Sequence, residues 1–211
     1  MAYDLYVITD EEIGQGLSHA ELARRAVDGG ADVIQLRDKR FSGRALLNAA
    51  VAVRKVTRDA GALFIVNDRL DVALAAGADG VHLGASDLPI GEARRLAPPG
   101  FIIGASVGSA AAAVRAAAEG ADYVALSPTF STGSKDDAGL GHGLAVLSAV
   151  RAAVSLPLVA IGGINAANVA DVIAAGADGV AVISAVVGQE DVTAAARDLR
   201  SRIAAAKAGR R

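Results

Sequence analysis

Gly30-Ala31-Asp32-Val33 is the first of four copies of one motif in this chain, and the others are Gly77-Ala78-Asp79-Gly80, Gly120-Ala121-Asp122-Tyr123 and Gly176-Ala177-Asp178-Gly179. Each copy follows an alanine-rich stretch and precedes a short apolar run, as expected where a glycine ends a helix before the chain enters a strand. Four further apolar runs alternate with these copies, at Leu5 to Thr9, Leu63 to Asn67, Phe101 to Ala105 and Leu158 to Ile161. The sequence therefore predicts eight strands.

Predicted helices fill the intervals between these strands. The first begins at Ser18 with a Ser-x-x-Glu capping box that ends at Glu21, and the others cover about 43–59, 70–76, 89–96, 109–118, 144–153, 166–174 and 191–207. Strict alternation of helices with buried parallel strands is typical of an open doubly wound sheet or of a closed barrel. The motif recurs at spacings of 47, 43 and 56 residues. An open sheet has no reason to space its turns so regularly, so the spacing favours a closed (β/α)8 TIM barrel. The alternative is that the four copies are coincidental helix ends.

Length and composition are consistent with a single α/β domain over residues 1–211, with a tail from about 201 that we expect to fray. Hydrophobic residues make up 53% of the chain and aromatic residues only 3%, so the core must be aliphatic. A formal charge of −2 argues against nucleic acid as a partner. No apolar run reaches roughly 18 residues and no basic region precedes the first strand. We expect a cytoplasmic protein that binds small molecules and no membrane.

Polar residues at the ends of barrel strands are candidates for function, because active sites of such barrels lie there. The second strand ends with Gln35, Arg37 and Lys39 on one face, by the period-two alternation of strands. Two cations side by side in the barrel mouth are costly without an anion, and their spacing suits a diphosphate. The alternative is that both form internal salt bridges with neighbouring strand ends.

Two carboxylates follow the next two strands. Asp68 comes after Val66-Asn67, and Asp87 follows His82-Leu83-Gly84. Two Asp side chains together with phosphate oxygens commonly hold Mg²⁺, which retains several waters. Asp87 could instead be a helix N-cap, and Asp68 could simply pair with Arg37 or Lys39. His82 faces inward beside them, but a lone inward His is as often a core residue as a catalyst.

Two further segments predict a second anion site. The long connection after the sixth strand carries Thr132, Ser134 and Lys135 among several glycines, as in a loop that closes on phosphates, although it could be only flexible. Gly162-Gly163 and Ile183-Ser184 end the seventh and eighth strands, where barrels often bind phosphate through backbone N–H groups and a short helix N-terminus.

Taken together, these residues resemble the thiamine phosphate synthase family from about Leu5 to Arg200. The matching pieces are Gln35-x-Arg37-x-Lys39, Val66-Asn67-Asp68, His82-Leu83-Gly84 with Asp87, Gly104-Ala105-Ser106, Thr132-x-Ser134-Lys135, Ile161-Gly162-Gly163-Ile164 and Ile183-Ser184-Ala185. Members of this family are transferases of thiamine biosynthesis, which join hydroxymethylpyrimidine diphosphate to hydroxyethylthiazole phosphate and release pyrophosphate. The resemblance also suggests a homodimer.

The resemblance implies a role for each matching residue. Asp68 and Asp87 would hold Mg²⁺, whereas Arg37, Lys39, Asn67 and Lys135 would hold the diphosphate, with Arg37, Lys39 and Lys135 acting in catalysis. Gln35 and Ser106 would contact the pyrimidine, and Thr132, Ser134, Gly163, Ile183 and Ser184 would bind the phosphate of the thiazole.

Two positions depart from the family pattern, namely Ala85, where the family often has Gln, and Gly108, where it often has His. Thiazole tautomerases, a sister group, use a His at the position of Gly108 and tend to lose the metal carboxylates and the diphosphate cations. This chain has the reverse pattern. The alternative functions are a tautomerase-like protein, a thiamine-phosphate-binding protein without catalysis and a sugar-phosphate epimerase on the same barrel.

Overall fold

The structure is a computed structural model that describes residues 3–132 and 141–210. Its strands are β1 (Leu5–Thr9), β2 (Val33–Leu36), β3 (Leu63–Asn67), β4 (Gly80–Leu83), β5 (Ile102–Val107), β6 (Tyr123–Leu126), β7 (Leu158–Ile161) and β8 (Gly179–Val182). Its helices are α1 (His19–Asp28), α2 (Gly43–Ala60), α3 (Leu70–Ala75), α4 (Ile90–Leu96), α5 (Ala110–Ala118), α6 (Gly143–Ala153), α7 (Val169–Ala174) and α8 (Val192–Ala208).

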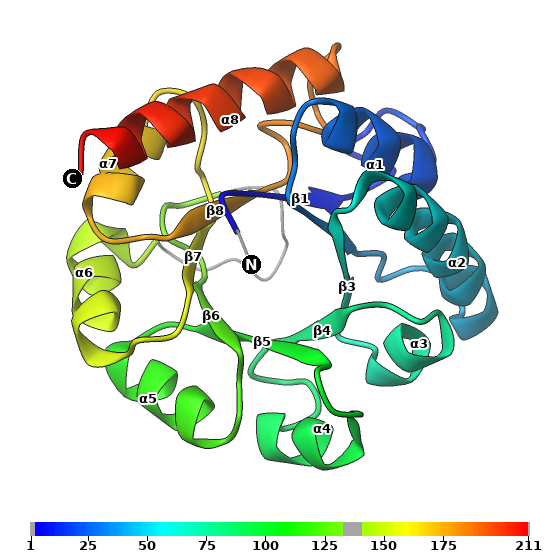
Figure 1. The fold of residues 1–211 in the computed structure, drawn as a ribbon, viewed down its shortest axis with the longest axis horizontal. Coiled ribbons are helices and arrows are strands. Elements are labelled where there is room, and N and C mark those ends of the chain that lie inside the picture. The colour runs from blue at the N-terminus through cyan, green and yellow to red at the C-terminus, as the bar shows by residue number, and fades with distance from the viewer. Residues whose placement is uncertain (1–2, 133–140, 211) are drawn as a thin grey trace.

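The eight parallel strands form a closed barrel in chain order, and β1 pairs with both β2 and β8. Figure 1 shows the helices as an outer ring around the strands. The predicted (β/α)8 barrel is therefore confirmed. Ser18 is the N-cap of α1 and accepts from the backbone N–H of Glu21, as predicted. The Glu21 carboxylate instead binds Arg24 and Arg25, so only half of the capping box forms.

At the end of the chain, α8 ends at Ala208, close to the predicted end at 207, and it includes residues 201–208 of the tail that we expect to fray. Ile203 is fully buried, and Lys207 and Arg200 both form ion pairs with Asp4 before β1. Helix α8 packs against α1 and α7 (Figure 1), so these contacts close the helical ring.

The aspartates of the repeated motif join neighbouring strands at the end of the barrel where the strands begin. One carboxylate oxygen of each accepts a hydrogen bond from the first or second residue of the preceding strand; the pairs are Asp32–Leu5, Asp79–Phe64, Asp122–Ile103 and Asp178–Leu158. Each Asp also pairs with an arginine from an even-numbered helix, namely Arg200, Arg54, Arg94 and Arg151, respectively. The four-fold repeat thus has a structural role at the N-terminal ends of the strands, opposite the C-terminal ends where the predicted site residues lie.

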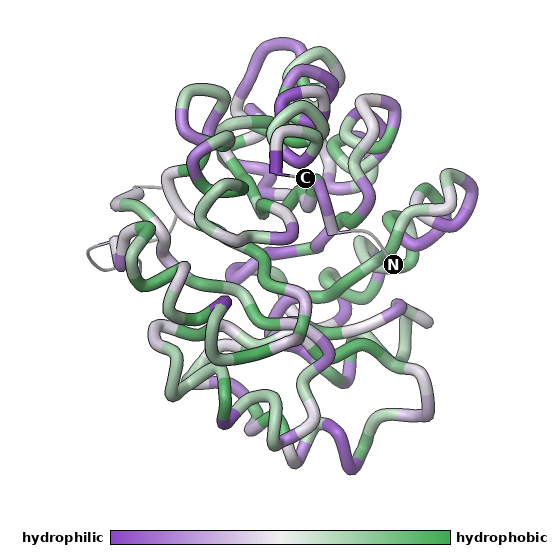
Figure 2. Tube along the Cα trace, turned by 60° about the vertical axis from the view of Figure 1, so that its left-hand side comes forward, coloured by the Kyte–Doolittle hydropathy of each residue, from purple (hydrophilic) through white to green (hydrophobic). Residues whose placement is uncertain are grey.

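The core is aliphatic, as the composition predicts, with an aromatic stack inside the barrel. Figure 2 shows hydrophobic residues running through the interior strands while hydrophilic residues recur along the outer helices. The ring of Tyr123 lies 5.0 Å from that of Tyr3 and 6.1 Å from that of Tyr6, centroid to centroid. A Cβ at Gly104 would lie 2.1 Å from the Tyr123 ring, so this glycine is needed to make room for it.

Candidate functional site

Two cavities open side by side among the C-terminal ends of the strands. The first has a volume of about 300 Å³ and is lined by Arg37, Lys39, Asn67, Asp68, His82, Gly84, Ala85, Ser86, Asp87, Ser106, Ser127 and Pro128. The second, of about 280 Å³, is lined mainly by the ends of β7 and β8 and includes Thr132, Gly163, Ile183, Ser184 and Gln189. Ser127 and Pro128 border both cavities. We call them the cationic cavity and the glycine cavity.

The two cations of the cationic cavity each face a carboxylate at a long distance. Arg37 Nη1 lies 3.4 Å from Asp10 Oδ2, and Lys39 Nζ lies 3.9 Å from Asp68 Oδ2. The internal salt bridges considered from the sequence are therefore present. Both pairs nevertheless border an open cavity, and the Lys39 side chain is 53% exposed. The Lys39 pair is long and partly exposed, so it contributes little stability and an anion can compete for Lys39, whereas the Arg37 and Asp10 side chains are only 11% and 16% exposed.

Asp68 and Asp87 lie beside one another in this cavity. Burial, and then the Asp87 carboxylate, raise the pKa of Asp68 to about 6, although Lys39 and Arg37 act in the opposite direction. Asp87 does not cap a helix, because the N-cap of α4 is Pro89; instead its Oδ2 accepts from the N–H of Gly84 at 2.7 Å. The N-cap alternative is therefore wrong.

The backbone at Asp68 is in the left-handed region, with φ of 62°. Its N–H donates to the carbonyl of His82 on the neighbouring strand at 2.9 Å. A non-glycine residue in this region is strained by roughly 1 kcal/mol or more, and such strain often occurs where a side chain must be aimed into a site.

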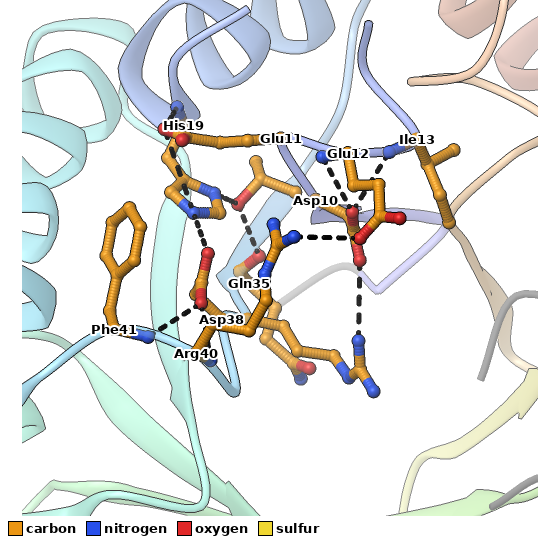
Figure 3. A network of polar contacts seen from close by, with 11 residues as sticks. Asp10, Glu11, Glu12, Ile13, His19, Gln35, Asp38, Arg40 and Phe41 are labelled. Carbon is orange, nitrogen blue, oxygen red and sulfur yellow. Dashed lines mark hydrogen bonds and ion pairs between the residues drawn. The ribbon is translucent and has the colours of Figure 1, made fainter. Parts of the chain in front are cut away.

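A buried polar network joins the end of β1 and the start of α1 to the turn after β2 (Figure 3). His19 Nδ1 is 2.8 Å from Thr9 Oγ1, and His19 Nε2 is 3.4 Å from Asp38 Oδ2. Asp38 stands between Arg37 and Lys39, and its other oxygen accepts from the N–H groups of Arg40 and Phe41. Thr9 and His19 are almost fully buried, so this hydroxyl–imidazole–carboxylate series has no access to a substrate. The network instead holds the turn after β2, which carries Arg37 and Lys39.

Gln35 and Ser106 lie at the two ends of a hydrogen-bond series through the barrel interior. Gln35 Nε2 donates to the Tyr6 hydroxyl at 2.6 Å, and that hydroxyl lies 3.0 Å from the Tyr123 hydroxyl. Tyr123 contacts His82 Nδ1, and His82 Nε2 contacts Ser106 Oγ, both at 2.9 Å. His82 is therefore part of a structured network and not an isolated core residue.

The glycine cavity is formed by close packing of backbone segments. Gly162 and Gly163 have φ of 102° and 63°, and a Cβ at Gly163 would lie 2.7 Å from the Ser131 carbonyl oxygen. After β8 there is one helical turn in place of the expected short helix, with the N–H groups of Val186 and Val187 bonded to the carbonyl of Ile183. The first N–H groups of such a turn have no partner within it, which suits an anion.

The structure brings most of the predicted site residues to one barrel mouth. Arg37, Lys39, Asn67, Asp68, Asp87 and Ser106 line the cationic cavity, and Thr132, Gly163, Ile183 and Ser184 line the glycine cavity. Gln35 lies deeper, beside a small interior cavity. Ser134 and Lys135 fall outside the described residues. Within residues 3–132 and 141–210, no group of three or more His, Cys, Asp or Glu side chains is placed to hold a metal.

Several contributors could not be identified from sequence. Tyr6 and Tyr123 looked like ordinary strand residues, and His19 looked like the start of a helix. His142 lies next to Gly108, where a Cβ would lie 3.0 Å from the imidazole ring, so an imidazole is present near a position where the family often carries one. Contacts between residues so distant in the chain leave no local signal.

Comparisons with known proteins agree on one family. The profile described as thiamine monophosphate synthase matches residues 5–186. A thiamine-phosphate synthase of Methanoculleus marisnigri is 82% identical over 208 residues, covering 99% of both chains, and that of Moorella thermoacetica is 54% identical over 205 residues, covering 97% of this chain and 98% of the other.

Solved structures give the same result. The thiamine phosphate pyrophosphorylase from Pyrococcus furiosus superposes with a TM-score of 0.90 at 44% identity and covers 97% of this chain and 96% of its own. A 3-hexulose-6-phosphate synthase superposes with a TM-score of 0.73 at 24% identity, over 94% of this chain and 99% of its own, which shows a shared fold and nothing further. No helix of the described residues is long and apolar enough to span a membrane.

Proposed function

Because this chain belongs to the thiamine monophosphate synthase family, we propose that it joins hydroxymethylpyrimidine diphosphate to hydroxyethylthiazole phosphate, with release of pyrophosphate. The observation that carries the proposal is the pair of adjoining cavities. One combines two cations with two carboxylates, and the other is built from glycines and a helical turn. Two phosphorylated substrates whose reacting atoms must meet require such an arrangement.

The diphosphate would occupy the cationic cavity. Arg37 and Lys39, with Asn67 and Lys135, would bind its oxygens, and Gln35 and Ser106 would contact the pyrimidine ring. Ser127 and Pro128 border both cavities, so the pyrimidine would face the thiazole across them. The phosphate of the thiazole would bind beside Gly163, Ile183 and Ser184, with Thr132 and Ser134 closing over it.

The donor set of the cationic cavity fits Mg²⁺. Asp68 and Asp87 supply two carboxylates. Burial, and then the Asp87 carboxylate, raise the pKa of Asp68 despite Lys39 and Arg37, so a bound cation would stabilise the charged form of Asp68. Two carboxylates are too few for a closed protein cage, but they suit an ion that retains waters and shares phosphate oxygens. When bound, Mg²⁺ would neutralise charge on the departing diphosphate.

No nucleophile or strong base is needed from the protein. The C–O bond to the diphosphate breaks, and its electron pair leaves with pyrophosphate. The pyrimidinylmethyl cation that remains is stabilised by its own amino group until the thiazole nitrogen forms the new C–N bond. Arg37, Lys39 and Lys135 would stabilise the charge that develops on the leaving group, and the glycine cavity would hold the acceptor in line.

The test is pyrophosphate release by purified protein with Mg²⁺ and both substrates. We expect release only when both substrates are present, and we expect Asp68→Ala to reduce it by at least about 100-fold, a typical cost of losing a preorganised electrostatic group. Asp59→Ala removes an exposed carboxylate of α2 far from the mouth and should have no effect. Release without the thiazole phosphate, or full activity of Asp68→Ala, would contradict the proposal. A cytoplasmic location and a homodimer stay predictions.

A further inference from the structure

The hydrogen-bond series inside the barrel has a direction, because each hydroxyl has only one proton to donate. Gln35 donates from Nε2 to the Tyr6 hydroxyl, so the proton of Tyr6 is available for Tyr123. The Tyr123 hydroxyl then donates its hydrogen bond to Nδ1 of His82, which must carry no proton in order to accept. The His82 proton therefore lies on Nε2 and is donated to Ser106 Oγ.

This direction determines what the two ends offer a ligand. Gln35 uses its amide nitrogen on Tyr6 and lines the small interior cavity, so its Oε1 end presents an acceptor there. Ser106 Oγ accepts a hydrogen bond from His82 Nε2–H and lines the cationic cavity, with its own O–H still to donate. His82 lines both the small interior cavity and the cationic cavity, so the two cavities are neighbours at its imidazole.

The acceptor and the donor are coupled to each other. If the Gln35 amide turned over, every hydrogen bond in the series would have to reverse. Ser106 would then donate its proton to His82 and would offer a ligand only an acceptor. Tyr6 and Tyr123 are at most 1% exposed, and both line the small interior cavity beside Gln35. Buried polar networks that are fully satisfied tend to hold a single arrangement, since a broken link leaves an unpaired buried group.

We propose that Tyr6, Tyr123 and His82 are positioning residues that orient the Gln35 amide and the Ser106 hydroxyl to select an aminopyrimidine ring. This inference rests on the function proposed above. An aminopyrimidine presents an amino donor next to a ring-nitrogen acceptor. Its oxo counterpart presents a carbonyl acceptor next to a ring N–H donor, which is the opposite pattern. The series would thus discriminate between two rings of nearly the same shape.

The experiment compares the binding of three ligands by calorimetry with Mg²⁺ and without thiazole phosphate. The ligands are pyrophosphate, the aminopyrimidine diphosphate and the corresponding oxopyrimidine diphosphate. The wild type should prefer the amino ligand by about 100-fold or more, because mismatched polar groups leave buried donors and acceptors unpaired. Tyr6→Phe and Tyr123→Phe each keep the ring and break the series, so the preference should narrow by about 10-fold while pyrophosphate affinity is unchanged.

Tyr3→Phe is the matched control. Tyr3 belongs to the same aromatic stack, with its ring 5.0 Å from that of Tyr123, but its hydroxyl lies outside the series. The Tyr3→Phe variant should therefore prefer the amino ligand over the oxo ligand as strongly as the wild type does. The inference would be overturned if Tyr6→Phe, Tyr123→Phe and Tyr3→Phe all had the same ratio of affinities for the amino and oxo ligands. Loss of pyrophosphate release by the wild type would instead contradict the proposed function.

A second measurement reads the protonation of His82 in the wild-type protein. Nitrogen-15 NMR of the wild-type protein should show His82 with its proton on Nε2 and none on Nδ1. The signals can be assigned against the other two histidines of the chain, His19 and His142, by their loss in His82→Gln. A proton on Nδ1 would overturn the proposed direction.

Discussion

At the scale of single residues, Asp68 and its neighbour Asp87 form the carboxylate pair of the proposed Mg²⁺ site. Asp68 is half-buried, in a left-handed backbone conformation and beside a second carboxylate. Each of these features costs free energy in the folded state. They are consistent with a site that is completed by a bound cation and an anionic substrate.

A pH dependence follows from Asp68. Folding raises the pKa of Asp68 from its ordinary value of 3.8 to about 6, so the folded state binds more protons than the unfolded state between these pH values. The free energy of unfolding should therefore fall as the pH rises from about 4 to about 6. We expect a loss of roughly 2 kcal/mol, which is less than the full pKa shift would give because the site is partly solvated. Mg²⁺ should restore this loss and raise the melting temperature more at pH 7 than at pH 5. Equal effects of Mg²⁺ at the two pH values, or the same slope in Asp68→Asn, would contradict the assignment.

Asp79 represents the structural aspartates of the repeat. It accepts from the Phe64 N–H at 2.8 Å and pairs with Arg54 at 2.9 Å. Asp79→Ala leaves both groups without this partner and should lower the free energy of unfolding by about 2 kcal/mol in urea titration. Asp59→Ala serves as the control, because Asp59 is exposed and its ion pair with Arg58 is long, at 3.7 Å. A loss no larger than in the control would show that the repeat does not stabilise the barrel.

At the scale of elements, the segment after β6 packs directly on the end of β7. The N–H groups of Thr129 and Phe130 donate to the carbonyls of Ile161 and Gly162. The Gly162-Gly163 pair therefore has a packing role in addition to any contact with phosphate. The sequence suggested only phosphate binding, since the approach of residues 128–131 depends on tertiary structure.

Gly163→Ala tests this arrangement. The added Cβ would lie 2.7 Å from the Ser131 carbonyl oxygen and should displace the segment that borders the glycine cavity. We expect the KM for the thiazole phosphate to rise about 10-fold, with little change in pyrophosphate affinity. Gly77→Ala is a close control, because Gly77 has the same φ of 63° with no atom within 4 Å of the added Cβ. If both variants changed the KM equally, backbone strain and not displacement would be the cause.

At the scale of the whole molecule, the barrel depends on closure between its first and last elements. β1 pairs with β8, and α8 packs on both α1 and α7. Arg200 contacts both Asp4 and Asp32, so a residue near the end of the chain supports the start of the first two strands. The site lies at the other end of the same strands and requires this closure to hold its two cavities in place.

Removal of the last helical turns should therefore destabilise the entire barrel. A chain ending at Arg200 loses the buried Ile203 and the ion pair of Lys207 with Asp4. Loss of the Ile203 side chain alone is expected to cost about 3 kcal/mol, so the melting temperature should fall by several degrees or more. A chain ending at Ala208 keeps both contacts and should melt close to the full-length protein. Identical melting of the two truncated chains would indicate that the tail is dispensable.

The sequence by itself determined the barrel, its strand count and most of the residues at its mouth. Regular Gly-Ala-Asp spacing marks the helix-to-strand turns, and parallel strands in a barrel necessarily bring Arg37, Asp68 and Asp87 to one end. Helix boundaries were also accurate, because caps such as Ser18 act over a few neighbouring residues.

Only the tertiary structure decided which hydrogen bonds hold these residues in place and how they are distributed between the two cavities. The separation of the mouth into two cavities by Ser127 and Pro128, the network of His19 and Asp38, and the series from Gln35 to Ser106 all join residues far apart in the chain. Sequence periodicity shows which face a side chain occupies but not its partner across the barrel. Such partners depend on the packing of all eight strands at once, since a hydrogen bond requires both groups to lie within about 3 Å.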